Sequence, residues 1–229
     1  MGTKERQDRE RQAVTDSILN AARDLFVAEG YQSVSIRKIA ERIEYSPAAI
    51  YSYFPSKDDI FFALAEEGFL RLATYAAAAV ESLTDPLARV RAGIWAFYEF
   101  SKVHGQYFEL MFVDRSVPSL NQDFHRYDFF HEVLRRAEAD VRACVDAGRF
   151  SPGVDPSAAL HVLWAGMLGP ASLNFAQRLA PGEDPDRLAH DVLESLLAGF
   201  TTALHTTFVP CDMAHAHDEP HGAATKDPQ

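Results

Sequence analysis

Apolar residues recur at intervals of three and four along most of the chain, which is the spacing that places them on one face of a helix. Gly30 follows the first such run and is expected to end its helix, because glycine commonly terminates helices. No stretch shows the strict apolar–polar alternation of a strand or the turn signal of a hairpin. The pattern therefore predicts an all-α protein. The first run consists of Val14, Ile18, Ala21, Ala22, Leu25 and Phe26.

Two short helices are predicted next, at about residues 35–43 and 46–53. Ser35 is the expected N-cap of the first, and Ser46 followed by proline begins the second in the preferred order of cap and first helical residue. Glu44 falls in the tight turn between them, where glycine is usual because the backbone is left-handed. A non-glycine residue in that conformation costs on the order of 1–2 kcal/mol. We expect Tyr45, next to it, to pack against the core.

The rest of the chain divides into longer helices and two polar ends. A long helix is predicted from Ser56 to about residue 82, and the last two helices at about 156–178 and 185–208. The first eleven residues carry no apolar anchors and are predicted to be a flexible arm. The final segment is polar and contains proline, which is typical of disorder. The predicted units are an arm at 1–11, domains at 12–55 and 56–208, and a tail at 209–229.

The formal net charge of −11 is unevenly distributed along the chain. Residues 1–60 hold 9 Lys and Arg against 10 Asp and Glu, whereas residues 61–229 hold 13 against 23. The nearly neutral first segment can still present a basic face through Arg37, Lys38 and Lys57. The acidity of the whole chain therefore does not exclude nucleic acid as a partner of its first sixty residues.

The sequence favours a cytoplasmic protein with no membrane partner and no catalytic activity. No apolar run approaches the roughly 18 residues that span a bilayer, and the N-terminus begins with charged residues instead of a secretory signal. The two cysteines form no disulfide framework. His131-Glu132 lacks the second histidine of a helical zinc site, and there is no glycine-rich phosphate loop. We expect no catalytic residue, no cofactor and no metal site in the folded domains.

The stretch SIRKIAERIEYSPAAIYSYFPSKDDIFFAL, residues 35–64, has the order of a helix-turn-helix. In that unit the second helix enters the major groove of DNA and the first braces it. Together with the helical acidic remainder, it resembles the TetR/AcrR family of bacterial transcriptional repressors over residues 14–64, and more loosely to residue 208. The C-terminal half is similar to the branch with a Trp-x-x-x-His-Gly signature. Trp164 and Gly169 match it, but Leu168 replaces the histidine, so no ligand role of that histidine carries over.

The resemblance implies DNA contacts from both short helices. Lys57 would hold a phosphate, and the hydroxyls of Tyr51 and Tyr53 would fix the register on the duplex. Arg37 would contact a guanine or, alternatively, a phosphate. For Tyr53 the alternative is packing beside Phe54. The expected DNA-binding residues are Ser35, Arg37, Lys38, Ser46, Pro47, Ala48, Ala49, Tyr51, Ser52, Tyr53 and Lys57.

A repressor of this type binds a palindromic operator as a dimer, because its two recognition helices must lie about one turn of DNA apart, roughly 34–36 Å. The last two helices are the expected interface of this homodimer, although they could instead close the core of one subunit. The expected interface residues are Leu160, Trp164, Leu196, Phe200 and Leu204.

The middle helices are expected to enclose a small apolar or amphipathic effector whose binding releases the DNA. Each aromatic residue there could equally be an ordinary core residue. The expected lining residues are Trp95, Tyr98, Tyr107, Phe108, Phe112, Phe130, Trp164 and Leu168. A metal-responsive regulator is the alternative, because the tail holds four residues that suit zinc or nickel. These are Cys211, His215, His217 and His221, which could also be incidental.

Overall fold

A computed structural model describes residues 3–118 and 128–202, with the side chains of residues 4–118 and 131–202. Every regular element in that part of the chain is helical, which confirms the predicted fold class. No helix among the described residues combines the length and the apolar character needed to cross a membrane. The elements are α1 (Thr3–Glu29), a 3₁₀ turn η1 (Tyr31–Ser33), α2 (Ile36–Arg42), α3 (Pro47–Tyr51), α4 (Lys57–Val80), α5 (Pro86–Val103), α6 (Gly105–Phe108), a π-helical segment η2 (Glu109–Val113), α7 (Asp128–Asp146), α8 (Pro156–Phe175) and α9 (Pro185–Gly199).

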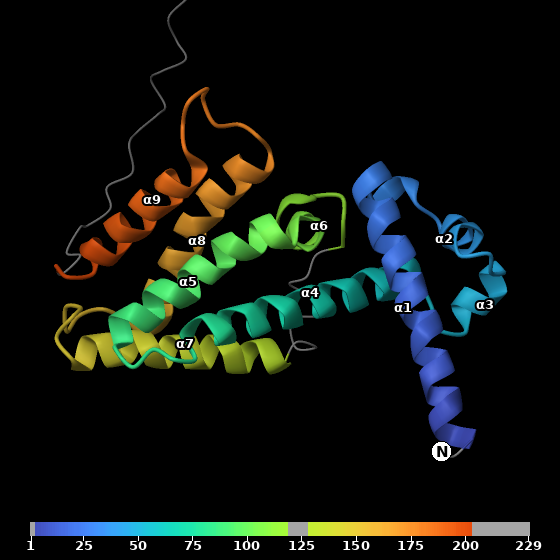
Figure 1. Ribbon diagram of the computed structural model, residues 1–229, viewed down its shortest axis with the longest axis horizontal. Coiled ribbons are helices and arrows are strands. Elements are labelled where there is room, and N and C mark those ends of the chain that lie inside the picture. The colour runs from blue at the N-terminus through green and yellow to red at the C-terminus, as the bar shows by residue number, and fades with distance from the viewer. Residues whose placement is uncertain (1–2, 119–127, 203–229) are drawn as a thin grey trace, which may run out of the picture.

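The molecule has two parts joined by α4. Helices α1, α2 and α3 gather at one end, and α4 runs from them to the other end, where it packs on α5 and α7 (Figure 1). Helices α8 and α9 form a further pair that packs on α5. One continuous hydrophobic core extends from Ile18 in α1 to Phe200 after α9. The small N-terminal part is therefore anchored to the larger part through α4.

The helix starts follow the capping residues of the sequence. Ser35, Ser46 and Ser56 each accept a hydrogen bond from the backbone N–H three residues later, at 3.3, 3.1 and 3.1 Å. Asp85 and Asp155 do the same at the starts of α5 and α8, each at 2.8 Å. These bonds satisfy N–H groups that have no partner within the helix. The three serine caps were predicted and are confirmed.

Two predicted helix ends are wrong. Helix α1 begins at Thr3, so it includes residues 3–11 of the segment that was predicted to be a flexible arm before the first helix. Exposed side-chain contacts support this first part of the helix, including the Arg6–Glu10 ion pair and the bond from Gln12 to Asp16. Helix α9 ends at Gly199 instead of residue 208. The predicted tail at 209–229 lies outside the described residues.

Two glycines allow helices to approach closely in the larger part. A Cβ atom on Gly68 of α4 would overlap the sulfur of Met111 and lie 3.1 Å from Cδ1 of Tyr107. A Cβ atom on Gly166 of α8 would overlap Cδ1 of Leu196 on α9. Gly68 therefore permits the contact between α4 and the α6–η2 segment.

Candidate DNA-binding site and effector region

The turn between α2 and α3 is a Schellman motif with glutamate in the position that usually holds glycine. Glu44 has a φ of 59°, in the left-handed region. The N–H of Tyr45 donates to the carbonyl of Ala40 at 2.9 Å, and the N–H of Glu44 donates to the carbonyl of Glu41 at 3.3 Å. This is the hydrogen-bond pattern of that motif. The prediction of a left-handed non-glycine residue here is confirmed.

Helix α3 presents one face to solvent and one to the core. Ile50 is fully buried, whereas Pro47, Ala48 and Ser52 are exposed and Tyr51 is 55% exposed. The hydroxyl of Ser52 donates to the carbonyl of Ala49 at 2.7 Å. The outward face therefore offers small side chains and one tyrosine, as the sequence predicted.

Ala49 and Tyr45 lie differently from the sequence-based expectation. Ala49 is half-buried, so less of its methyl group is open for contact than that of Ala48. Tyr45 is 45% exposed, which contradicts its predicted packing in the core. It follows the left-handed residue directly, and this backbone conformation turns the chain outward before Ser46. Tyr45 therefore adds a second exposed tyrosine beside α3.

The predicted basic residues have partners within the protein. Arg37 pairs with Glu41 at 2.9 Å, and this pair is largely exposed. Lys38 pairs with Glu29. The ammonium group of Lys57 donates to the carbonyl of Tyr31 at 2.8 Å and lies 4.0 Å from the centre of its ring. Because exposed pairs of this kind contribute little stability, Arg37 can exchange its partner for a phosphate or a base at little cost.

Arg11 was not predicted as a site residue, yet it contacts the C-terminal end of α3. Its guanidinium lies 4.8 Å from the ring centre of Tyr53 and 3.4 Å from the carbonyl oxygen of Ser52. Tyr53 is half-buried beneath it. This contact could not be predicted from the sequence, because Arg11 lies before the apolar pattern of α1 begins.

Part of the predicted effector lining forms one aromatic cluster. The ring of Phe112 on η2 lies 5.6 Å from Phe108, 5.8 Å from Trp164 and 5.3 Å from Phe97, centre to centre. Phe97 also contacts Phe108 and Trp164. The cluster thus joins α5, α6, η2 and α8. Phe97 was missing from the predicted lining, although it stands among the same aromatic residues of the sequence.

The other predicted lining residues lie in different surroundings. Trp95 packs on Tyr98, whose hydroxyl donates to Asp186 of α9 at 2.8 Å. Leu168 is half-buried against the core. Tyr107 faces α1 and α4. Phe130 lies outside the described side chains.

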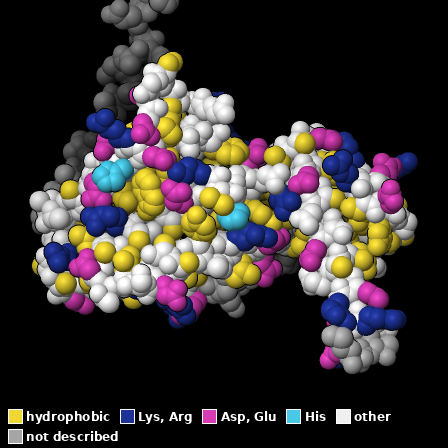
Figure 2. Space-filling view, viewed as in Figure 1, with side chains coloured by type: hydrophobic (Ala, Val, Ile, Leu, Met, Phe, Trp, Pro, Cys, Tyr) yellow, Lys and Arg dark blue, Asp and Glu magenta, His cyan; other side chains and the backbone are white. Residues whose placement is uncertain are grey.

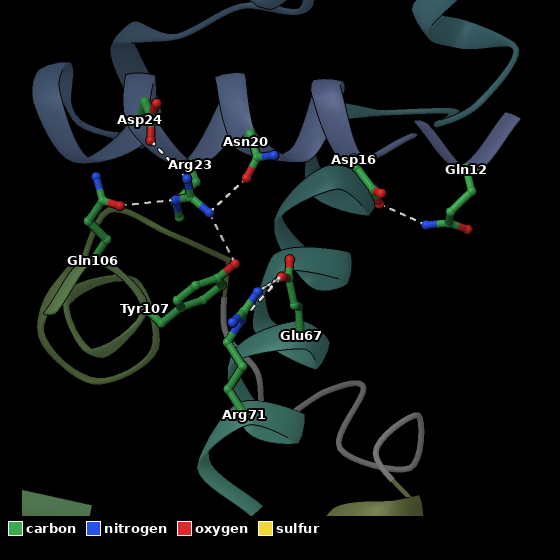
Figure 3. Close-up of polar contacts among 9 residues, drawn as sticks. All are labelled: Gln12, Asp16, Asn20, Arg23, Asp24, Glu67, Arg71, Gln106 and Tyr107. Atoms are coloured by element: carbon green, nitrogen blue, oxygen red, sulfur yellow. Dashed lines mark hydrogen bonds and ion pairs between the residues drawn. The ribbon is translucent and has the colours of Figure 1, made fainter. Parts of the chain in front are cut away.

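A polar network ties α1 to α6 where the two parts of the molecule meet (Figure 3). Arg23 donates to the amide oxygen of Gln106 at 3.0 Å, to the hydroxyl of Tyr107 at 3.2 Å and to Asn20 at 2.9 Å. The guanidinium groups of Arg23 and Arg71 both lie over the Tyr107 ring, 5.5 and 5.2 Å from its centre. Burial alone would lower the pKa of Arg23, but its interactions with Tyr107 and Asp24 together outweigh burial and raise that pKa, so the guanidinium stays charged.

A cavity of about 280 Å³ adjoins this network. Its wall includes Arg23, Arg71, His104, Gln106 and Tyr107. Burial, together with the nearby charge of Arg71, lowers the pKa of His104 below its usual value. The imidazole is therefore neutral near pH 7. The cavity lies beside α6, on the side of α6 that faces α1.

The α8–α9 pair buries two of the predicted interface residues within one subunit. Leu160 and Phe200 belong to the subunit core and so offer little surface to a second subunit. Trp164 and Leu196 are half-buried, and Leu204 lies outside the described residues.

Another set on α8 is exposed at helical spacing, and Figure 2 shows hydrophobic side chains at the surface over α8 and α9. Val162 is 45% exposed and Leu173 is 39% exposed. The exposed face of α8 could not be distinguished from its buried face by sequence, because both faces carry apolar residues. The set is Ala158, Val162, Ala165, Gly169 and Leu173.

The described residues contain no cluster of three or more potential metal ligands. The four tail residues of the metal alternative, Cys211, His215, His217 and His221, lie outside the described part of the chain. Cys144, the described cysteine, is buried, and burial raises the pKa of its thiol to about 11. It is therefore a core residue.

A helix-turn-helix joined to a larger helical part is typical of DNA-binding regulators. Comparison with known proteins identifies the family within this class. Residues 18–64 match the family described as bacterial regulatory proteins, tetR family, and residues 90–196 match a tetracyclin repressor-like C-terminal domain. The chain belongs to the TetR family. Its family is described as one of regulatory proteins, and the relatives that it matches are transcriptional regulators.

Two regulators illustrate the similarity in sequence. The HTH-type transcriptional regulator HbdR of Aromatoleum sp. (strain CIB) is 31% identical over 137 residues, which cover 59% of this chain and 59% of HbdR. The match therefore spans about three fifths of that relative. The HTH-type transcriptional repressor AcnR of Corynebacterium diphtheriae is 29% identical over 175 residues, which cover 75% of this chain and 83% of AcnR.

Solved structures show the same fold. A protein of unknown function from Rhodococcus sp. RHA1 has a TM-score of 0.68 at 25% identity, covering 82% of this chain and 95% of that chain. The fatty acid degradation regulator FadR from Bacillus halodurans has a TM-score of 0.66 at 18% identity, covering 80% and 98%. The second likeness concerns the fold alone.

Proposed function

We propose that this protein is a dimeric, ligand-responsive repressor that binds a palindromic operator through α2 and α3. The observation that carries the proposal is the exposed face of α3, with Ala48, Tyr51 and Ser52 open to solvent on a helix fixed by Ile50. A helix of this kind fits the major groove, and small side chains allow close approach to base edges. The exposed guanidinium of Arg37 supplies the longer reach that α3 lacks.

The dimer is proposed to form through α8 and α9. The exposed α8 set of Ala158, Val162, Ala165, Gly169 and Leu173 places small and aliphatic side chains on one face. Small residues let two helices approach closely, and aliphatic residues bury apolar area, so this face suits a four-helix bundle made from two subunits. A dimer also supplies the second recognition helix that a palindrome requires.

The effector is proposed to be a small apolar or amphipathic molecule that contacts the aromatic cluster around Phe112. The fold accommodates such molecules, since FadR from Bacillus subtilis, with the same fold, has been solved in complex with stearoyl-CoA. A ligand that separates the rings of Phe108, Phe112 and Trp164 must shift η2 and α6. Because Arg23 bonds Gln106 and Tyr107 of α6, that shift reaches α1 and changes the position of the DNA-binding part.

Two substitutions test the DNA-binding assignment on an operator obtained by selection from random duplexes. Lys57→Ala removes a phosphate contact from each subunit, so it should weaken all operator variants alike and lower the salt slope of log K by about 2 for the dimer. Arg37→Ala should instead relax the preference at one base pair. Fluorescence anisotropy over a salt series measures both effects. If both variants bind like the unaltered protein, the assignment of these residues is wrong.

A further inference from the structure

Helix α1 continues well past the domain that it helps to build. All side chains of residues 4–13 are exposed, and the first fully buried residue of the helix is Ile18. At a rise of 1.5 Å per residue, the seven residues before Arg11 extend about 10 Å beyond it. Figure 1 shows this end of α1 projecting past α3, away from helices α4 to α9.

Arg11 marks the point where α1 passes the recognition helix. It contacts the ring of Tyr53 and the carbonyl of Ser52, both at the C-terminal end of α3. The part of α1 before Arg11 therefore emerges beside the surface that α3 presents to DNA. A duplex long enough to continue past the site read by α3 would run close to this helix.

One side of α1 changes from apolar to charged where the core ends. Residues seven apart lie on the same side of a helix, and one such series is Lys4, Arg11, Ile18 and Leu25. Ile18 and Leu25 are buried in the domain core, so this side of α1 faces the domain. Beyond the core the same side carries two cations, with Asp8 between them.

The two cations of this series are available to an anion. Neither Lys4 nor Arg11 has a carboxylate within ion-pair distance among the residues that the structure describes. In contrast, Arg37 and Lys38 each have one. Arg6 points about 200° around the helix from Lys4 and pairs with Glu10 at 3.4 Å.

We infer that the N-terminal end of α1 is a second DNA-contacting element, which lies along the phosphate backbone flanking the site read by α3. Lys4 and Arg11 hold phosphates, and Asp8 opposes them. Point charges on phosphate carry no sequence information, so this element adds affinity and salt dependence without changing base preference. The inference rests on the proposed binding of an operator by α2 and α3.

The test compares two charge-matched variants on the same helix. Lys4→Gln and Arg6→Gln each remove one positive charge from an exposed position, so the fold is not at risk. Binding to the selected operator, with flanks of about one helical turn, is measured by anisotropy at 50 and 200 mM salt. Each lost phosphate contact lowers the slope by about 0.9 and a dimer loses two contacts, so the loss of affinity between these salt concentrations should become about twelvefold smaller in Lys4→Gln. Arg6→Gln should keep the full salt dependence.

Two further measurements sharpen the result. Asp8→Asn should tighten binding, because it removes a negative charge that opposes the phosphates. Glu10→Gln, on the other side of the helix, should not tighten binding. A loss of structure could not explain tighter binding. Trimming the flanks from the duplex should abolish the difference between Lys4→Gln and the unaltered protein. The inference is overturned if Lys4→Gln keeps the full salt slope, or if Lys4→Gln and Arg6→Gln lower it equally, since only total charge would then matter. If the unaltered protein binds no selected operator at all, the proposed function itself fails, which is a different outcome.

Discussion

Glu44 stores strain in the turn that sets the angle between α2 and α3. Its left-handed backbone is held by the two bonds to Ala40 and Glu41, and its side chain makes no hydrogen bond or ion pair among the described residues. The strain was predictable from the sequence, because the turn lies between two recognisable caps. The outward position of Tyr45 was not predictable from the sequence, since it depends on the direction that the backbone takes after the left-handed residue.

Glu44→Gly should stabilise the protein. Removing the Cβ relieves about 1–2 kcal/mol of backbone strain, part of which is offset by the larger entropy of glycine in the unfolded chain, so the net gain should be about 1 kcal/mol. Urea unfolding followed by circular dichroism measures the change. Glu41→Gly, inside α2, is the control and should cost about 1 kcal/mol. A loss of stability in Glu44→Gly would contradict the assigned strain.

His104 should make stability depend on pH. Its pKa in the folded protein is lowered by burial and by Arg71 from an unfolded value of about 6.5. The unfolded chain therefore binds more protons as the pH falls below that value, so the free energy of unfolding decreases. His104→Gln should lose less stability than the unaltered protein between pH 7 and pH 5, measured by urea midpoints. An unchanged pH dependence would contradict the lowered pKa.

At the scale of elements, helix starts were easier to predict than helix ends or faces. Ser35, Ser46 and Ser56 identified starts because a cap is a local interaction between a side chain and the next turn. The start of α1 was missed because its first residues are held by charged pairs and not by an apolar stripe. The exposed face of α8 was missed because only packing against α5 and α9 distinguishes it from the buried face.

Two helical glycines, Gly68 on α4 and Gly93 on α5, test how closely α4 packs against the α6–η2 segment. Gly93→Ala should stabilise the protein by about 1 kcal/mol through helix propensity, because its added Cβ meets only Cγ1 of Val80, at 3.7 Å. Gly68→Ala has the same intrinsic gain but overlaps Met111 and crowds Tyr107. It should therefore be less stable than Gly93→Ala by about 1–3 kcal/mol in urea unfolding. Equal stability of the two variants would mean that the crossing has room for a methyl group.

At the scale of the whole molecule, the unequal distribution of charge and the helical pattern predicted two parts, and the structure has two helical parts joined by α4. The aromatic residues were harder to place, since Trp95, Tyr98 and Tyr107 occur in the same stretch of sequence as Phe108 and Phe112. Only the folded arrangement separates those that contact α9 or α1 from those that meet Trp164. The same holds for the residues of α8 that are exposed in the structure.

The α8 face should control the oligomeric state. Val162→Glu places a charge at the centre of the proposed interface, so the protein should be a monomer at micromolar concentration, whereas the unaltered protein should be a dimer. Leu70→Glu is the matched control, since Leu70 on α4 is also exposed, and it should remain dimeric. Size-exclusion chromatography with light scattering measures the mass. A dimeric Val162→Glu would move the interface elsewhere, and a monomeric unaltered protein would exclude the proposed dimer.

The most direct test of the account is selection of duplex DNA from a random library by the full-length protein, followed by sequencing of the bound fraction. A dimer that reads DNA with one α3 helix from each subunit predicts an enriched palindrome, whose half-sites are centred about one helical turn apart or a small multiple of it. Enrichment of an asymmetric site, or no enrichment over the starting library, would contradict the central claim.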